Sequence, residues 1–536
     1  MEEQRIDKKI LREIVGKIKQ QSLTKKQAWV AVKKICKEHK LNTLPTNVQI
    51  LDVCTDEEKE KLKKLLLLKP TRTASGVAII TVACKPAECP GRCLYCPRGE
   101  NAPQSYTGME PAIQRAIRNK YDPFKQVADR LNQYRLMGHP VDKIELIIIG
   151  GTFLAAGKKY QEGFVRGLYD ALNGAEIKSK SNSKTKSKSK SLLQAQKINE
   201  TAAARCSGLA IETRADYCMK PHINRMLKFG VTRVEIGLQS IYPDVLKKIT
   251  RMHTVDDAIV ATQLAKDSCL KCTYHIMPGL FVDQKKDLEQ FKILFGNPDF
   301  RPDSLKIYPT LVIKNTELYK MWKAGDYKPL SNQQAVKLLA ECMRYVPKYC
   351  RIIRVQRDIP KPEIVAGVNK SNLRELVEQR AERIGIRIRE IRYREVGHRI
   401  ERGSSVDLSS VKLCRLDYDA SGGREIFLSM EDEKNNVLVA FLRLRIPGEP
   451  FRPEITDKTA LVRELHVYGP SVRIGEKEKT AWQHRGFGRR LLEQAEKIAV
   501  EEFEKNKMVV ISGVGVRKYY YGLGYKLDGP YVSKKI

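Results

Sequence analysis

Three cysteines are the residues of this 536-residue chain whose spacing most directly suggests chemistry. Cys89, Cys93 and Cys96 follow one another with the spacing C-x3-C-x2-C. Iron–sulfur clusters are held by thiolates, and three thiolates this close together can bind three irons of a [4Fe-4S] cubane. The fourth iron then has no protein ligand and stays open to a small chelating molecule. The spacing therefore predicts a [4Fe-4S] cluster held by these three residues.

Other interpretations of the triplet are weaker. A structural zinc ion needs four closed ligands, and no further Cys-x2-Cys or His-x3-His pair follows at the spacing of a zinc finger. A chance group of buried cysteines does not suit the run either, because Pro90, Gly91 and Pro97 predict a loop. Cys84 lies just upstream and could replace one of the three as a ligand.

Several polar and glycine residues further along would suit S-adenosylmethionine (SAM), the molecule that radical SAM enzymes bind to the open iron of such a cluster. Gly150 and Gly151 follow the apolar residues 147–149 and would let the backbone approach the methionyl amino group. Glu212, Arg214 and Gln239 end later strands and are candidates for ribose or carboxylate contacts. The alternatives are a tight strand-to-helix turn and ordinary loop polarity.

A second motif predicts a phosphate-binding loop near the C-terminus. Gln483 is followed by Gly486, Phe487 and Gly488 at the start of an amphipathic helix, in the pattern Q/R-x-x-G-x-G/A of GNAT acetyltransferases. Backbone N–H groups at a helix N-terminus favour the pyrophosphate of a coenzyme. We therefore predict acetyl-CoA as a co-substrate, with the preceding strand, residues 463–467, splayed from its neighbour to bind the pantetheine arm.

Three consecutive tyrosines follow this motif, Tyr519, Tyr520 and Tyr521. GNAT enzymes often place a phenol near the thioester sulfur at this point, so Tyr519 or Tyr520 is the expected residue. Aromatic packing is the alternative.

Apolar strands alternate with amphipathic helices through the central part of the chain. This alternation predicts a parallel sheet curled into a full or partial TIM-like barrel, with functional residues at the carboxyl ends of its strands. The expected strands are residues 77–82, 144–149, 209–212, 233–237, 272–277 and 305–308, and the expected helices include 112–133 and 256–266. We therefore predict an α/β multidomain fold.

Four regions follow from these patterns. Residues 1–70 are expected to form a basic helical region that binds tRNA, although a solvated helix face is an equal alternative. Residues 71–365 form the radical SAM barrel, interrupted by a disordered Lys/Ser loop at 176–197 whose centre lacks apolar residues. Residues 366–410 form a connector, and 411–536 form the GNAT domain.

The charge of the chain favours a polyanionic partner. Lys and Arg total 98 against 63 acidic residues, a formal net charge of +35. No apolar stretch is long enough to span a bilayer, so nucleic acid is preferred over a membrane surface. Thirteen cysteines without an export signal suit a reducing interior, and we expect a cytoplasmic protein.

Longer motifs identify a resemblance that covers nearly the whole chain. A radical SAM barrel and an acetyl-CoA module in one basic chain resemble the catalytic subunit of Elongator, the third Elongator protein, in its stand-alone archaeal form. The motifs include His139-Pro-Val-Asp-Lys143, Leu305-Lys-Ile-Tyr-Pro-Thr310, Val355-Gln-Arg-Asp-Ile-Pro360, Arg463-Glu-Leu-His-Val-Tyr-Gly469 and Ile511-Ser-Gly-Val-Gly515.

The resemblance implies an enzyme that modifies the wobble uridine in the anticodon stem-loop of tRNA. Acetyl-CoA contacts carried over from the family are Lys143, Glu464, Leu465, His466, Val467, Gly486 to Gly488 and Tyr519. A SAM-derived 5′-deoxyadenosyl radical would take hydrogen from the acetyl methyl group, and the carbon radical would add to C5 of uridine. Loss of one electron and one proton, with hydrolysis of the thioester, would then give 5-carboxymethyluridine. The electron donor and a homodimer stay open.

Two points depart from this family or compete with it. Many prokaryotic relatives carry a zinc-binding cysteine cluster in the connector, whereas residues 386–395 contain no cysteine, so we predict no zinc and a surface or packing role for His398. The competing functions are a protein-lysine acetyltransferase with a structural iron–sulfur cluster and a non-catalytic RNA-binding scaffold. The tRNA function suits the charge better, since a cationic enzyme gains nothing from a lysine-rich substrate.

Overall fold

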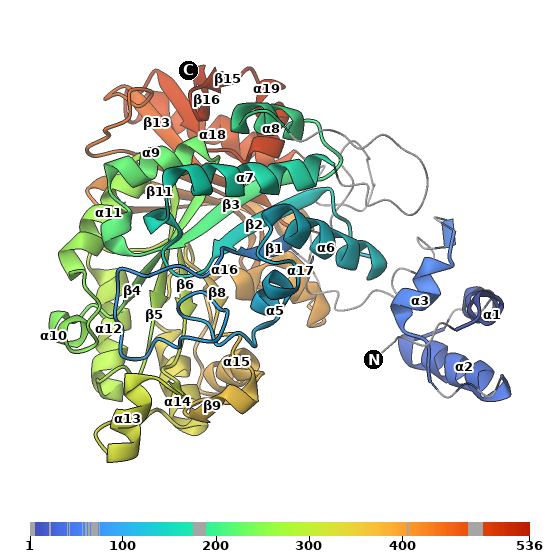
Figure 1. Cartoon of the computed structure of the whole chain (residues 1–536). Coiled ribbons are helices and arrows are strands. Elements are labelled where there is room, and N and C mark those ends of the chain that lie inside the picture. The colour runs from blue at the N-terminus through green and yellow to red at the C-terminus, as the bar shows by residue number, and fades with distance from the viewer. Residues whose placement is uncertain are drawn as a thin grey trace.

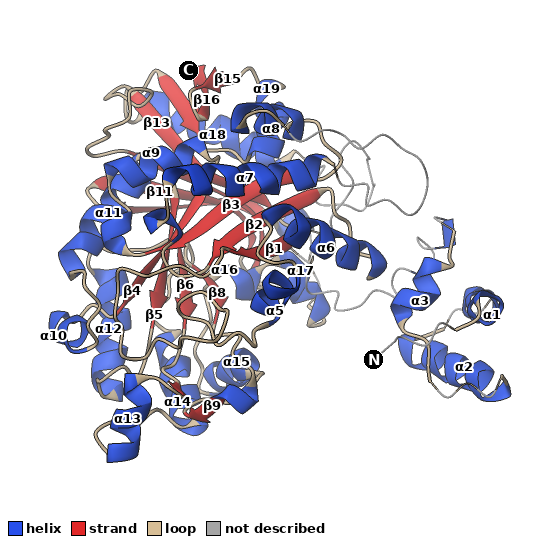
Figure 2. Cartoon of the chain, viewed as in Figure 1, coloured by secondary structure: helices blue, strands red, loops and turns tan. Residues whose placement is uncertain are grey.

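A computed structural model describes residues 6–469 and 486–536, apart from 21–22, 40, 42, 56, 59–61, 63–64, 66–72, 74, 175–188, 405 and 407. Figure 1 shows the arrangement of the elements, and Figure 2 shows two groups of strands surrounded by helices. Among the described residues, every helix is too short or too polar to span a bilayer.

The central sheet is the predicted partial barrel. Its seven strands run in the order β1-β2-β3-β4-β5-β6-β8, and all neighbouring pairs are parallel. Their inward and outward side chains are largely buried, as expected for a sheet covered by crossover helices. The bounds are β1 Ala78–Ala83, β2 Lys143–Ile149, β3 Arg205–Thr213, β4 Arg233–Gln239, β5 Lys271–Ile276, β6 Ser304–Ile307 and β8 Arg351–Arg354.

Crossover helices cover the outside of this barrel. They include α7 Lys158–Asn173, α9 Lys220–Lys228, α11 Val255–Asp267, α12 Gln284–Gly296 and α14 Asn332–Cys342. Shorter elements at the barrel's mouth are α10 Pro243–Lys248, α13 Glu317–Ala324, and the paired strands β7 Val312–Ile313 and β9 Ile364–Ala366.

The single helix expected at 112–133 is wrong. The chain forms two helices there, α5 Pro111–Arg118 and α6 Pro123–Leu136. Asp122 caps α6 through its side chain, and Pro123 takes the first helical position, where its missing N–H costs no hydrogen bond. A proline inside one continuous helix would instead remove a bond and clash with the preceding turn.

The second sheet holds seven strands in the order β10-β11-β12-β13-β14-β16-β15. Only β13 and β14 are parallel, and they pair through residues 459–462 alone. Within the described residues, 463–467 have no strand partner on that side, which matches the predicted splay. The bounds are β10 Lys412–Ala420, β11 Gly423–Asp432, β12 Val437–Ile446, β13 Thr459–Val467, β14 Lys507–Val510, β15 Lys526–Asp528 and β16 Tyr531–Lys535, with helices α18 Phe487–Glu501 and α19 Arg517–Tyr521.

The regions outside the two sheets are helical. At the N-terminus α1 Lys8–Lys19, α2 Lys25–Glu38 and α3 Asn47–Asp52 share a small core of their own. The connector holds α15 Leu373–Arg383, α16 Ile391–Arg394 and α17 Val396–Glu401.

The expected disordered loop at 176–197 is wrong at its end. Residues 175–188 lie outside the described part of the chain, but 192–197 belong to helix α8 Leu192–Asn199. Ser191 caps this helix by accepting the backbone N–H of Gln194, and Leu192 and Ala195 are buried. An apolar face against the barrel therefore orders residues 192–197, although they follow a lysine- and serine-rich segment.

The second sheet packs across the amino ends of the barrel strands (Figure 1). A buried ion network holds the two sheets together: Arg463 on β13 donates to both oxygens of Asp303, at 2.6 and 2.7 Å, just before β6. Arg445 on β12 pairs with Asp267 at 2.6 Å, at the end of α11. Glu425 accepts from both arginines.

Candidate functional site

A cavity of about 630 Å³ opens at the carboxyl ends of the barrel strands. Its position agrees with the rule that ligands bind at that end of a parallel sheet. Seven residues predicted from the sequence line it together, namely Cys89, Cys93, Cys96, Gly151, Glu212, Arg214 and Gln239.

The cysteine loop is held in place by its backbone. Leu94 donates to the carbonyl of Ile249 at 3.2 Å and accepts from the N–H of Leu318 at 3.0 Å, which ties the loop to α10 and α13. The N–H of Cys96 bonds to the carbonyl of Cys93 at 3.1 Å, closing a turn. This turn gathers the three thiols at the cavity.

The three thiols fit a metal cluster by their surroundings. All three are half-buried and line the cavity. Arg251 donates to Cys93 Sγ at 3.4 Å, and Cys96 Sγ lies 3.0 Å from Ser105 Oγ. A buried cation and a hydroxyl beside the sulfurs are the kind of neighbours that stabilise thiolate charge.

Cys84 is not suited to replace a member of the triplet. Its side chain is buried and donates from Sγ to the carbonyl of Gly150 at 3.0 Å. Burial raises the pKa of this thiol to about 12, which disfavours the thiolate that a metal needs. Cys89, Cys93 and Cys96 line the cavity, whereas Cys84 does not.

The glycine pair after β2 needs to be glycine. Gly150 has φ +121° and Gly151 has φ +70°, a region that side chains rarely adopt. A Cβ on Gly150 would also lie 2.6 Å from Cys84 Sγ. The turn brings Gly151 to the cavity wall, and Gly150 lies behind it against Cys84.

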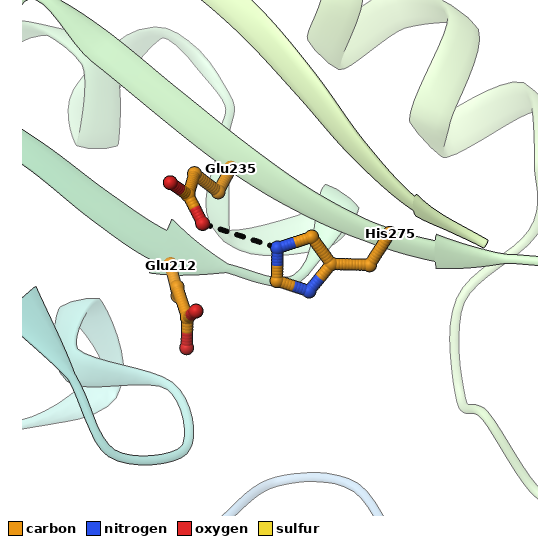
Figure 3. Close-up of side chains that lie close together, drawn as sticks. All are labelled: Glu212, Glu235 and His275. Atoms are coloured by element: carbon orange, nitrogen blue, oxygen red, sulfur yellow. Dashed lines mark hydrogen bonds and ion pairs between the residues drawn. The ribbon is translucent and has the colours of Figure 1, made fainter. Parts of the chain in front are cut away.

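Charged side chains form the floor of the cavity, where Glu212, His275 and Lys306 line it. Figure 3 shows Glu212 and His275 together with the buried Glu235. Glu212, Glu235 and His275 come from three adjacent strands, and His275 Nε2 lies 3.1 Å from a Glu235 oxygen. Lys306 on β6 donates to Glu212 at 2.9 Å and also contacts Glu235. Burial opposes its charge, but Glu235 holds the pKa of Lys306 well above its usual value. The ammonium group thus supplies the positive charge that a metal ion would otherwise bring to these carboxylates.

Sequence reasoning did not assign His275 and Lys306 to the site. Both are ionisable residues that are flanked on each side by buried Tyr, Ile or Leu near the carboxyl end of a strand, which is the signal that could have found them. Glu235 lies inside the expected strand 233–237 and was not predicted as a site residue.

Arg214 is poised to bind a further group. Its side chain is almost fully buried, donates to both oxygens of Asp216 at 2.9 Å, and donates to the carbonyl of Met252 at 2.8 Å. Its Nη1 has no hydrogen-bond partner among the described residues. A Cβ on Gly91 would lie 2.4 Å from that nitrogen, so the arginine reaches under the cysteine loop. A buried donor without a partner marks a place for an acceptor such as a carboxylate.

The predicted coenzyme loop forms a second cluster on the other sheet. Gly486 has φ +77° and begins α18, and Gln483 lies outside the described residues. A Cβ on Gly488 would meet Tyr519 Oη at 3.0 Å, with side-chain atoms of Val467 at 3.5 Å and Leu465 at 3.9 Å. Phe487 is half-buried at the first turn of the helix.

The two candidate tyrosines differ in their surroundings. Tyr519 is 42% exposed and faces Gly488. Tyr520 is buried against Tyr525, with ring centroids 5.8 Å apart. Tyr520 therefore packs in the core, and Tyr519 is the tyrosine at the loop.

Two further residues that the family resemblance assigns to acetyl-CoA, Glu464 and His466, point toward the barrel. Side chains alternate along β13, so Glu464 and His466 face away from Leu465 and Val467. Glu464 accepts from Arg443 at 2.9 Å and pairs with Lys271 at 3.3 Å, while His466 Nε2 lies 3.2 Å from the carbonyl of Ser75. Burial acts to raise the pKa of Glu464, but its cationic neighbours hold it at about 2.

Lys143 lies at the amino end of β2 and does not line the cysteine cavity. It pairs across the sheet with Arg205, which Gly515 of the second unit approaches closely. Burial lowers the pKa of Lys143. The lysine is thus beside the second unit, at the far end of the strand from Gly151.

His398 in the connector is a packing residue. It is nearly buried, with Nδ1 3.6 Å from Glu401, and burial lowers its pKa to about 4.

Comparisons with known proteins agree with both units. The radical SAM superfamily matches residues 87–295, its C-terminal domain matches 302–383, and the "ELP3 N-terminal domain" matches 7–74. The tRNA uridine(34) acetyltransferase of Methanocaldococcus jannaschii is 51% identical over 499 residues, 91% of this chain and 90% of that protein.

Eukaryotic relatives and a solved structure extend the likeness. Elongator complex protein 3 of Schizosaccharomyces pombe is 46% identical over 94% of this chain and 93% of its own length, and the human protein is 45% identical over 94% and 92%. The structure of the archaeal Methanocaldococcus infernus Elp3 with an N-terminal deletion has a TM-score of 0.75 at 48% identity, covering 87% of this chain and all of that one. The chain therefore belongs to the Elongator protein 3 family.

Proposed function

We propose that this protein is an enzyme that modifies the wobble uridine of tRNA, with SAM and acetyl-CoA as co-substrates and 5-carboxymethyluridine as the product. The observation that carries the proposal is one cavity that brings together the cysteine triplet, Gly151 and Arg214. The names of the relatives, tRNA uridine(34) acetyltransferase and Elongator complex protein 3, support the substrate.

In the barrel, Cys89, Cys93 and Cys96 would hold a [4Fe-4S] cluster. When bound and reduced, this cluster supplies the electron that cleaves SAM and starts radical chemistry. Arg214 offers its unpartnered Nη1 to the carboxylate of SAM, and the backbone at Gly151 allows the ligand to approach closely. The ion-paired floor beneath them is fixed before any ligand binds, so it adds no reorganisation cost.

In the second unit, backbone N–H groups from Gly486 to Gly488 would bind the pyrophosphate of acetyl-CoA at the N-terminus of α18. The unpaired edge of β13 would bind the pantetheine arm, and Tyr519 would lie near the sulfur. Lys143 and Glu464 lie at the amino end of the barrel, where the thioester would enter.

The tRNA would bind through the negative charge of its phosphates, and the target base would be selected by its position. Helices α1 and α2 carry basic residues outside their small core, and they would bind phosphates of the anticodon stem. The target base has to leave the stack to reach a cavity at the strand ends.

The test is an anaerobic reaction of the cluster-loaded protein with SAM, acetyl-CoA, dithionite and a tRNA transcript, followed by mass spectrometry of the nucleosides. We expect a uridine that is heavier by one carboxymethyl group, and no such product from Cys93→Ser. An unchanged uridine mass with fully loaded protein would refute the proposal. Acetylation of a lysine peptide at equal rates by both proteins, without a tRNA product, would favour a protein-lysine acetyltransferase.

A further inference from the structure

One wall of the cysteine cavity has no part in the chemistry described so far. The wall follows the carboxyl end of β8, the last strand of the barrel sheet, and continues onto α15 and α16. We call it the arginine wall and define it by Arg354, Gln356, Arg374 and Arg392, all of which line the cavity.

The guanidinium groups of this wall surround the end of one strand. Arg374 donates to the carbonyl of Ile352 at 2.6 Å, and Arg392 donates to the carbonyl of Ile353 at 3.0 Å. Arg354 belongs to the strand itself and pairs with Asp358 at 2.5 Å. Three cations are thus anchored within three consecutive residues of β8.

The nearby carboxylates do not balance these cations. Asp358 is exposed to solvent, where an ion pair contributes little. Glu390 lies 3.4 Å from Arg374, but it also accepts the backbone N–H groups of Ile352, Arg392 and Tyr393. Glu378 is shared between Arg374 and Arg402.

Arg392 is the member with the poorest compensation. Among the described residues it forms no ion pair, and its hydrogen bond goes to a backbone carbonyl. Burial, with Arg374 and Arg351 adding to it, lowers the pKa of Arg392 to about 10. A half-buried guanidinium with surplus positive charge around it is stabilised when an anion arrives.

Gln356 gives an independent sign of a ligand. Its Oε1 is buried at the cavity wall and has no hydrogen-bond partner among the described residues. A buried acceptor without a protein partner is a place for a donor from a ligand or from water. The wall thus offers donors for an anion next to an acceptor for an N–H or O–H group.

A nucleotide combines these features, since its phosphate is anionic and its ribose and base carry donors. The geometry points to the arginine wall as the site of a phosphodiester group of the RNA, next to the nucleotide that enters the cavity, with Arg392 as its principal contact. This inference rests on the proposed function, and it names the group that the open edge of the barrel recognises.

The test compares Arg392→Gln with Arg344→Gln, an equal loss of charge at an exposed arginine beyond the C-terminal end of α14 that does not line the cavity. Binding of a fluorescent anticodon stem-loop RNA is measured by anisotropy across a range of salt concentrations. We expect Arg392→Gln to bind roughly tenfold more weakly, with a salt slope reduced by about one. Arg344→Gln should bind like the wild type.

Thermal unfolding separates this role from a structural one. Removing a poorly compensated cation should leave the melting temperature of Arg392→Gln unchanged or higher, whereas a residue that only supports β8 would lower it. Lower stability with unchanged RNA affinity would overturn the inference. Weaker SAM binding by the cluster-loaded variant, measured by equilibrium dialysis, with unchanged RNA affinity would also overturn it, because the anion would then be the SAM carboxylate.

Stem-loops with a single neutral methylphosphonate linkage locate the contact. At the linkage that Arg392 touches, the modification should weaken wild-type binding but leave Arg392→Gln unaffected. Additive losses at every linkage would overturn the inference while leaving the proposed function intact. No binding of any stem-loop by the wild type would overturn both.

Discussion

Asp287 is a buried carboxyl group below the loop that follows β5. Its Oδ2 accepts the N–H of Gly279 at 2.7 Å, and its Oδ1 has no partner among the described residues. Burial raises the pKa of Asp287 to about 7. The folded protein therefore keeps this proton at pH values where the unfolded chain has lost it.

The consequence is a pH-dependent stability. Between about pH 4 and pH 7 the folded state binds more protons than the unfolded state, so the free energy of unfolding falls as pH rises, by about 4 kcal/mol in total. In Asp287→Asn this contribution disappears, because an amide still accepts from Gly279 but does not titrate. Urea unfolding of both proteins at pH 5 and pH 8 measures the difference. If the free energy of unfolding fell equally in the two proteins between pH 5 and pH 8, the prediction would be contradicted.

At the residue scale, local signals predicted what lay close together in the sequence. The cysteine triplet and the Gly150–Gly151 turn are short runs, and both line or support the cavity. His275 and Lys306 were missed because they lie in two separate strands, and only the pairing of β4, β5 and β6 in the sheet brings them to Glu235. The choice between Tyr519 and Tyr520 likewise depended on packing.

At the scale of elements, the first turn of α18 is the part of the expected coenzyme site that is most sensitive to a small substitution. A Cβ on Gly488 would point at Tyr519, in the space between the helix and β13. Gly488→Ala should weaken acetyl-CoA binding roughly tenfold, which corresponds to about 1.4 kcal/mol, as measured by calorimetric titration.

The matched control is Gly163→Ala, because nothing lies within 4 Å of a Cβ at that position in α7. It should bind acetyl-CoA normally and gain a little helix stability. Equal affinity in both variants would show that the start of α18 is not the coenzyme site.

Element types were largely predictable and element boundaries less so. Six of the seven barrel strands were expected within a few residues of their positions, because buried parallel strands are largely continuous apolar runs. Strand β8 was not predicted, because it is short and has an arginine at each end. The break between α5 and α6 was missed because the helical periodicity continues on both sides of Pro123. Helix α8 was missed because its burial depends on the barrel surface that it covers.

At the scale of the whole molecule, the two sheets are joined by buried charge. Asp303 neutralises Arg463 and Arg443, all three of which are buried. Asp303→Asn would leave Arg463 with a share of Glu425 and Arg443 with Glu464 alone, and removing one partner from a buried ion network costs on the order of 3–5 kcal/mol.

We expect a lower midpoint in thermal and urea unfolding for this variant. Asp299→Asn, a change of the same kind at an exposed aspartate nearby, should unfold like the wild type. A variant of Asp303 with an unchanged midpoint would mean that the network contributes no net stability to the joint between the sheets.

The second sheet covers one end of the barrel strands, and the cysteine cavity opens at the other. Under the proposed function, tRNA and acetyl-CoA enter from opposite ends of the barrel strands. Neither has to dissociate before the other binds. Saturating amounts of either reactant should then leave room for its partner, so that steady-state kinetics would lack mutual competition. An inhibitor that occupies one of the two entrances would then leave binding at the other entrance intact.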